Sequence, residues 1–365
     1  MIRLRNLSID NLEIPFKTIF QHSSAERDTS ETILVTAETE SGVKGVGEGC
    51  PRQYVTGETL NSAHDFFNKY ISDFYEIGCI GDIKAWAASN EKLIDQNPAA
   101  FCSVELALLY AMAAENDQSL ETLLGTEELS GEFRYTGVMG FSNSEKFRKQ
   151  LGQYLGFGFE DFKVKVFGKP EIDHKNISSL KKCGENGIRV RFDANNLWNG
   201  PDKAITYLTE MDYPMFALEE PLAARSYDSF RKVRLVLGTP IVLDESFSKM
   251  GDFDCLEGDA KNWIINLRVS KMGGIFRSLA IAERARELGT KLIIGAQVGE
   301  TSLLTRAALA IANNHRDQVM AQEGAFGTHL LKWDICDPPI MFSRGGVLKG
   351  SDVCAYPEIR INVLP

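Results

Sequence analysis

Short apolar runs that end in a polar residue recur through the second half of the chain. The segment 162–166, with sequence FKVKV, predicts a strand with three apolar side chains on one face and two lysines on the other. Further apolar runs end at Asp193, Glu219 and Asp244, at an interval of about 26 residues. One strand, one helix and two turns fill such an interval, so the pattern predicts a repeated βα unit.

Eight strands of this kind are predicted, at residues 134–139, 162–166, 188–192, 215–218, 240–243, 263–267, 291–294 and 319–322. Eight parallel strands with helices between them close a barrel, and such barrels carry their chemistry at the C-terminal ends of the strands. The polar side chains predicted at those ends are Lys163, Lys165, Asp193, Glu219, Asp244, Lys271 and Glu323.

The first third of the chain has a different pattern. Strands are predicted at 4–12, 33–38 and 43–49, and helices at 59–75, 82–95 and 98–117. Strands followed by segregated helices predict an α+β domain, which we place at 1–128 with the tail 345–365 packing back on it, beside a barrel at 129–344. The polar stretch 16–31 has no regular pattern and, together with 52–57, is predicted to be a lid.

Composition narrows the classes of function. The net charge of −10 argues against nucleic acid or an anionic membrane as a partner, because the chain has neither a basic patch nor a basic tail. The seven cysteines are scattered without a Cys-x-x-Cys pair, which indicates reduced thiols. We expect neither a signal peptide nor a membrane span. These observations predict a cytoplasmic protein whose partner is a small molecule.

Three acids that end successive strands form a candidate metal site. The carboxylates of Asp193, Glu219 and Asp244 should converge, and they would repel one another unless a cation lay between them. An all-oxygen set of ligands favours Mg²⁺. The alternative is that each acid caps the helix that follows its strand.

Two lysines flank the predicted metal site, Lys165 from the second strand and Lys271 from the sixth. An amine that is desolvated or lies near another cation, as Lys165 would near Lys163, has a lowered pKa and can act as a base. Around a metal that binds a carboxylate, such amines suit removal of the α-proton to give an enediolate. A Schiff-base aldolase that uses Lys271, and a non-catalytic binding protein, are alternatives from other classes.

Five motifs occur in order: Lys163-Val164-Lys165, Asp193-Ala194-Asn195, Glu219-Glu220-Pro221, Asp244-Glu245-Ser246 and Lys271-Met272-Gly273-Gly274. With these motifs the chain resembles the enolase superfamily, and within it the muconate lactonizing enzyme subgroup, which is related to mandelate racemase. The resemblance implies an α/β fold, a (β/α)7β TIM-like barrel with an α+β capping domain formed by the N-terminal segment and the C-terminal tail. It also implies Mg²⁺ on Asp193, Glu219 and Asp244, with Lys165 and Lys271 as the acid/base pair.

Dipeptide epimerases of this subgroup resemble the chain in two further positions, a threonine at the end of the first strand and an acid at the end of the eighth. The residues that we expect to contact the substrate are Lys163, Thr136, Glu323, Phe20, His22 and Arg27. The residues that we expect to surround the metal ligands are Asn195, Glu245 and Arg268. Relatives usually carry lysine where this chain has Arg268.

The resemblance implies an epimerase or racemase that acts on a dipeptide or an N-acyl amino acid, and we expect a homo-oligomer. The same apparatus also supports cycloisomerisation of the muconate type and dehydration to o-succinylbenzoate. In these alternatives only one lysine need move a proton. Isotope exchange at the α-carbon, with or without inversion, separates them from an epimerase.

Overall fold

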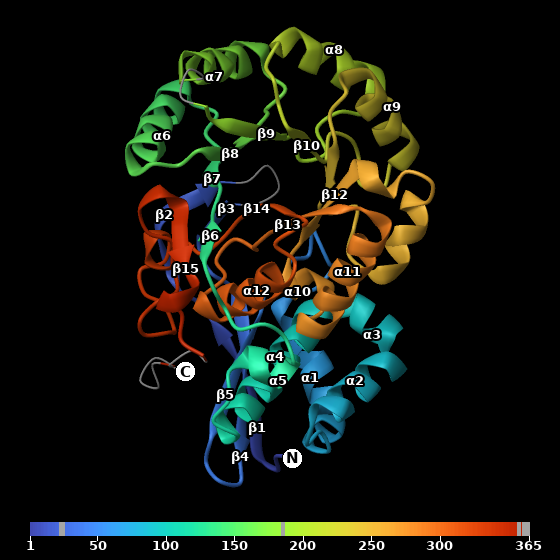
Figure 1. The fold of residues 1–365 in the computed structure, drawn as a ribbon, viewed down its shortest axis with the longest axis vertical. Helices are drawn as coiled ribbons and strands as arrows, with labels where there is room; N and C mark the ends of the chain where they lie inside the picture. Colours follow the sequence, from blue (N-terminus) through green and yellow to red (C-terminus); the bar gives the residue numbers. More distant parts are fainter. Residues whose placement is uncertain (22–25, 184–186, 356–358, 360–365) are drawn as a thin grey trace.

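The structure is a computed structural model that describes residues 1–21, 26–183, 187–355 and 359. Figure 1 shows two parts, a barrel with helices around its outside and a smaller capping domain built from the N-terminal strands and helices. The predicted fold class is confirmed: a parallel eight-stranded sheet alternates with helices, and the N-terminal part is an antiparallel sheet with helices.

The barrel strands are β7 (Gly137–Met139), β8 (Asp161–Lys165), β9 (Arg189–Asp193), β10 (Ala217–Glu219), β11 (Ile241–Leu243), β12 (Trp263–Leu267), β13 (Lys291–Ile294) and β14 (Val319–Gln322). They lie in chain order, and every neighbouring pair is parallel. The backbone N–H of Thr136 donates to the oxygen of Gln322 at 2.8 Å and links the first strand region to the last.

The outer helices are α6 (Ser144–Phe157), α7 (Pro170–Cys183), α8 (Pro201–Met211), α9 (Tyr227–Leu237), α10 (Val269–Met272), α11 (Ile275–Leu288) and α12 (Ser302–Asn314). Two 3-10 turns, η2 (Met250–Leu256) and η3 (Ala260–Asn262), replace a helix between β11 and β12. The predicted alternation on β8 is confirmed. Phe162 and Val164 belong to the apolar core, whereas Lys163 and Lys165 line a cavity.

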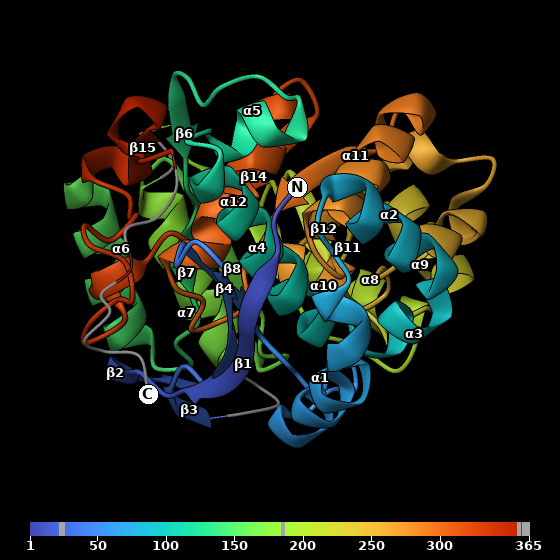
Figure 2. The same cartoon turned by 90° about the horizontal axis from the view of Figure 1, so that it is seen from below.

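The capping domain contains β1 (Leu4–Leu12), β4 (Thr32–Thr39), β5 (Lys44–Gly49), α1 (Leu60–Tyr75), α2 (Ile80–Ser89), α3 (Glu91–Gln96), α4 (Pro98–Glu115) and α5 (Leu120–Leu124). Glycine on β5 lets α4 lie directly on the sheet, since a Cβ at Gly47 would come within 2.0 Å of the oxygen of Ser103. Helix α4 also contacts α10 of the barrel, and both helices are labelled in Figure 2. The single helix predicted at 82–95 is two helices, α2 and α3.

Helix α4 departs from the expectation that no segment is apolar enough to span a membrane. By length and composition alone it is such a helix, one of this kind among the described residues. However, 89% of it is buried inside the fold, as in a core helix.

In its described part, the predicted lid segment 16–31 is a β-hairpin and not an irregular loop, so that part of the prediction is wrong. Strands β2 (Pro15–Gln21) and β3 (Glu26–Thr29) pair antiparallel. The backbone of Lys17 donates to Leu330 at 2.8 Å, and that of Lys332 donates to Pro15 at 2.9 Å. These bonds attach the hairpin to the segment after β14, at the cavity end of the barrel.

The C-terminal segment, which we expected on the capping domain, packs on the barrel side in its described part. Strand β15 (Val347–Lys349) pairs antiparallel with β6 (Glu132–Arg134), the short strand just before β7. Arg306 on α12 donates to the backbone oxygens of Cys354 at 3.1 Å and Ala355 at 2.9 Å.

The predicted first barrel strand at 134–139 is divided between β6 and β7.

Candidate active site

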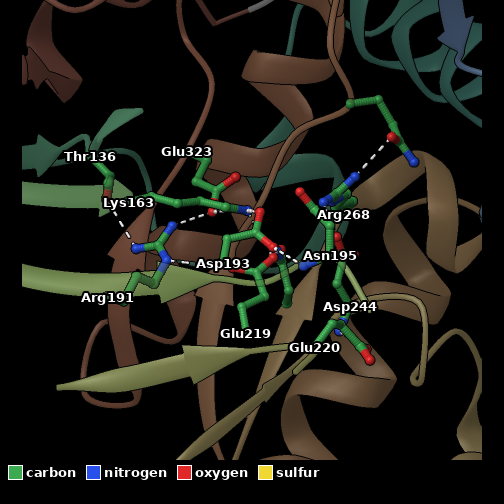
Figure 3. Close-up of polar contacts among 12 residues, drawn as sticks. Thr136, Lys163, Arg191, Asp193, Asn195, Glu219, Glu220, Asp244, Arg268 and Glu323 are labelled. Atoms are coloured by element: carbon green, nitrogen blue, oxygen red, sulfur yellow. Dashed lines mark hydrogen bonds and ion pairs between the residues drawn. The ribbon is translucent and has the colours of Figure 1, made fainter. Parts of the chain in front are cut away.

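The three predicted metal ligands lie together at the C-terminal end of the barrel (Figure 3). Asp193 ends β9, Glu219 ends β10, and the two are direct partners in the strand register. Asp244 follows β11, the next strand. All three side chains are buried, and none of the three caps a described helix.

Lys163 holds the first two acids together. Its Nζ lies 2.8 Å from Oε1 of Glu219, 3.1 Å from Oδ2 of Asp193 and 3.4 Å from Oε1 of Glu323. Burial opposes its charge, but Asp193 and the neighbouring acids outweigh burial and raise the pKa of Lys163 above its ordinary value. Lys163 is therefore a fixed cation and no base.

Both the backbone and the carboxylate of Asp244 are fixed by polar contacts. The carboxylate of Glu220 accepts from the backbone N–H groups of Asp244 and Ser246, each at 2.8 Å, and fixes the turn after β11. Arg268 donates to Oδ2 of Asp244, and Lys271 lies 3.0 Å from its Oδ1. Burial would raise the pKa of Asp244, but Arg268 and Lys271 outweigh it and hold that pKa low.

Lys165 lines a cavity of about 470 Å³ together with Asp193, Asp244 and Arg268. In the sheet Lys165 is the register partner of Asp193. Burial lowers the pKa of Lys165 to about 8; Asp193 opposes this and Lys163 adds to it. Lys163 does lower the pKa of Lys165, as predicted, although burial is the larger cause.

The second predicted acid/base residue is placed differently. Lys271 lies on α10, and its Nζ donates to the oxygen of Asp244 at 2.7 Å, to Oδ1 of Asp244 at 3.0 Å and to the oxygen of Asn266 at 2.7 Å. These bonds use all three N–H donors of an ammonium group. Lys271 is not among the described residues that line the cavity, whereas Arg268 is.

Arg268 occupies the position opposite Lys165 in the barrel. It follows β12, the sixth strand of the sheet, whereas Lys165 ends the second, and strands four apart in a barrel of eight face one another. Arg268 donates to Asp244 and, at 2.9 Å, to Oε1 of Gln297. A guanidinium stays protonated at all ordinary pH values, so it supplies charge and no base.

Glu323 and Thr136, predicted to contact the substrate, belong to a buried ionic network. Arg191, fully buried on β9, donates to Oε1 of Glu323 and at 3.4 Å to Oγ1 of Thr136. The hydroxyl of Thr136 donates to Asp161 at 2.5 Å. Glu323 still lines the cavity, but Thr136 is not among its described lining residues. The alternation on β9, with Arg191 two residues before Asp193, is the signal that could have identified this arginine.

The predicted lid residues contribute little to the described cavity wall. His22 and the side chain of Phe20 lie outside the described residues. Arg27 donates to the carboxylate of Glu31 and is not a described lining residue. Tyr54, in the second predicted lid segment, does line the cavity.

Of the residues predicted to surround the ligands, Asn195, Glu245 and Arg268 all line the cavity. The backbone N–H of Asn195 donates to Oδ1 of Asp193 at 3.0 Å. Burial, with Asp244 adding to it, raises the pKa of Glu245 to about 7. Gln297 and aromatic side chains of α6 and of the segment after β14 also line the cavity, and no pattern in the sequence predicts them there.

The donor set fits a hard divalent cation. Three carboxylates on adjacent strands supply only oxygen, and Oε2 of Glu219 is buried and accepts no hydrogen bond from the described residues. In the described arrangement no three acidic, histidine or cysteine side chains already enclose a cation, because Lys163 and Arg268 hold the acids. A cation at this site would share these carboxylates with Lys163 and Arg268.

Comparisons with known proteins agree with this geometry. The chain is 24% identical over 327 residues to a hydrophobic dipeptide epimerase of Enterococcus faecalis, covering 89% of this chain and 92% of that protein. It is 24% identical over 309 residues to an N-succinyl-L-Arg/Lys racemase of Bacillus cereus, covering 82% and 81%.

One solved structure, a dipeptide epimerase from Enterococcus faecalis complexed with Mg and the dipeptide L-Leu-L-Tyr, shares the fold with a TM-score of 0.79 at 22% identity. The match covers 95% of this chain and 96% of that one. The family described as Enolase C-terminal domain-like matches residues 146–350, which include the strand-end acids and both predicted catalytic lysines. The match spans more than half of the chain, so this protein belongs to the Enolase C-terminal domain-like family.

Proposed function

We propose that this protein is a magnesium-dependent enzyme that removes the α-proton of a small carboxylate substrate through an enediolate. The principal reaction that we propose is epimerisation or racemisation of a dipeptide or an N-acyl amino acid. The observation that carries the proposal is Lys165, a buried amine with a pKa of about 8 in the same cavity as Asp193 and Asp244. The names of the relatives support inversion of a stereocentre as the outcome.

Asp193, Glu219 and Asp244 would hold the metal. When bound, Mg²⁺ supplies a Lewis acid that neutralises charge developing on the substrate carboxylate. Lys163 and Arg268 add fixed positive charge beside that carboxylate. Lys165 accepts the α-proton from one face of the substrate and can return it.

A second candidate function follows from the groups that lie opposite Lys165, on the other face of the substrate. There the described cavity wall presents Arg268, and Lys271 is turned away into three hydrogen bonds. With one base, the same removal of a proton would lead to cycloisomerisation or to dehydration without inversion. The position of Lys271 also argues against a Schiff-base aldolase, because its amine does not reach the cavity.

The test is incubation with Mg²⁺ in D₂O of libraries of dipeptides and N-acyl amino acids, followed by mass spectrometry and chiral separation. Deuterium at the α-carbon together with inversion supports the epimerase, and deuterium without inversion supports the second candidate. Full exchange in excess chelator would contradict the proposed magnesium requirement. A homo-oligomeric assembly and a cytoplasmic location remain predictions.

A further inference from the structure

The cavity has two chemically different ends. Its charged lining residues sit at or just after barrel strands, around Lys165 and Asp244. Its other end is an aromatic chamber, which we define as Phe157, Phe159, Phe326, His329 and Phe342. Apart from His329 and the phenol of Tyr154, no described lining residue from α6, from 325–330 or at 342 carries an ionisable side chain.

Phe342 is the centre of the aromatic chamber. Its ring lies 4.7 Å from that of His329 in a stacked arrangement, and 5.3 Å from the rings of Phe159 and Phe326 in edge contacts. The His329 ring nitrogen Nε2 lies 3.1 Å from the oxygen of Phe342, within hydrogen-bond distance. Phe159 and Phe342 are almost fully buried in the core, so packing holds in place the apolar surface that the chamber presents to the cavity.

Gln297 supplies a polar group beside this surface. Its Oε1 accepts from Nη1 of Arg268 at 2.9 Å, which fixes the orientation of the amide, because a guanidinium can only donate. The other amide atom, Nε2, is buried and has no hydrogen-bond partner among the described residues. The residue as a whole is 3% exposed. A buried donor left without an acceptor is unfavourable, so a partner is expected when the cavity is filled.

The loop that carries Gln297 adjoins the aromatic chamber. The backbone N–H of Glu323 donates to Ile294 at 2.8 Å, so the two chain segments leave their strands side by side. A Cβ at Gly324 would lie 2.7 Å from the Cβ of Ala296. Gly324 is two residues before Phe326, and Ala296 directly precedes Gln297. The segment that carries the orphaned donor and the segment that leads to Phe326 therefore lie side by side.

We propose that the cavity selects carboxylates whose α-nitrogen carries a neutral, aromatic acyl group. The acyl carbonyl accepts a hydrogen bond from Nε2 of Gln297, and the ring enters the aromatic chamber. This inference rests on the proposed function and names its substrate class. A free α-ammonium is disfavoured at Glu323, because Arg191 and Lys163 already pair with that carboxylate. A negatively charged acyl tail would find no described lysine or arginine in the chamber.

The first experiment compares N-benzoyl-, N-acetyl- and N-succinyl-alanine with the dipeptide Ala-Ala. Each is tested as both enantiomers at the exchanging carbon, by deuterium wash-in with Mg²⁺. We expect kcat/KM for the benzoyl compound to exceed that for the acetyl compound at least about tenfold, since a phenyl ring is buried. The succinyl compound and the dipeptide should exchange more slowly than the benzoyl compound.

The second experiment uses two variants and two matched controls. Gln297→Met keeps the length of the side chain but removes the donor, and should lower kcat/KM on N-benzoyl-alanine about 5- to 100-fold. Phe157→Asp puts a charge into the chamber and should abolish the preference for benzoyl over acetyl. Gln118→Met and Leu235→Asp, at exposed sites on other elements, should leave both rates unchanged. Circular dichroism verifies folding.

The outcomes separate the two proposals. If no N-acyl amino acid or dipeptide takes up deuterium, the proposed function is wrong and this inference falls with it. If exchange occurs but succinyl, acetyl or dipeptide substrates match the benzoyl compound, the proposed function stands and the inference is overturned. Unchanged kinetics in both Gln297→Met and Phe157→Asp would also overturn it.

Discussion

The Nζ of Lys271 donates to both the backbone oxygen, at 2.7 Å, and the carboxylate, at 3.0 Å, of Asp244. A lysine bound in this way positions the carboxylate of Asp244, a proposed metal ligand. Arg268 contacts the same carboxylate from the cavity side. The two cations therefore have separate roles: Lys271 positions Asp244, and Arg268 presents a charge to the cavity. Their separate substitution should give different results.

The lysines should differ in their effect on the two enantiomers of a substrate. Lys165→Ala should lower deuterium exchange of one enantiomer by about 10²–10⁴-fold, because Lys165 is the base that we propose for that face. Lys271→Met should lower exchange of both enantiomers equally and weaken Mg²⁺ binding, because Asp244 loses its support. Wash-in for each enantiomer and titration calorimetry with Mg²⁺ measure these effects. A loss confined to one enantiomer in Lys271→Met would restore Lys271 as the second base.

Arg268→Lys should create a base on the face opposite Lys165. A lysine amine in a buried site can lose its proton near neutral pH, whereas a guanidinium cannot. We expect the variant to gain exchange of the enantiomer that exchanges more slowly in the natural protein. Arg268→Met, which removes the charge without adding a base, is the matched control. Equal gains in both variants would show that the position acts through its size alone.

The metal ligands should be essential for turnover but not for folding. Glu219→Gln removes one ligand charge and should abolish exchange while the far-ultraviolet circular dichroism stays unchanged. The amide still accepts from Nζ of Lys163, which in the present structure lies 2.8 Å from Oε1. The exposed Glu257→Gln serves as a control. Retained Mg²⁺-dependent activity in Glu219→Gln would remove Glu219 from the ligand set.

The rate should increase with pH through the pKa of the base. Lys165 must be neutral to accept a proton, and burial lowers its pKa to about 8. Below that pH, kcat/KM should therefore rise about tenfold per pH unit and then level off. Measuring kcat/KM against pH at a fixed Mg²⁺ concentration tests the direction of this change. A rate that falls across this interval would assign the base to another group.

The strand-end chemistry could be predicted because it depends on local periodicity. Alternation along 162–166 and a repeated spacing place Lys165 and the three acids at one end of a barrel, without knowledge of contacts between distant segments. The lysine on the sixth strand could not be placed in this way. Lys271 and Arg268 are three residues apart, and only the short helix α10 decides which of them turns toward the cavity.

Features that depend on long-range packing were harder to predict. Thr136 looked like a residue at a strand end, but the buried Arg191 and Asp161 engage its hydroxyl. Strand β2 forms backbone hydrogen bonds with residues near 330, more than 300 positions away. The aromatic chamber likewise combines α6 with the segment near Phe342. No local pattern in the sequence records such contacts.

A buried acid at the contact between the two domains should make stability depend on pH. Glu105 on α4 accepts from the backbone N–H of Ile275 at the start of α11, and its Oε1 has no partner among the described residues. Burial raises the pKa of Glu105 from 4.5 to about 8, against the effect of the Ile275 hydrogen bond. The folded state therefore holds a proton that the unfolded chain releases above pH 4.5.

This contribution to stability is present in full below pH 4.5 and is lost as the pH rises to about 8. The loss should be at most about 1.4 kcal/mol for each pH unit within that interval. Glu105→Gln keeps an acceptor for Ile275 but cannot ionise, so its free energy of unfolding should change less between pH 5 and 8. Urea unfolding at several pH values measures the difference, with the exposed Glu91→Gln as control. If the natural protein and Glu105→Gln show parallel pH profiles, Glu105 is not the group whose ionisation opposes docking of α4 on the barrel.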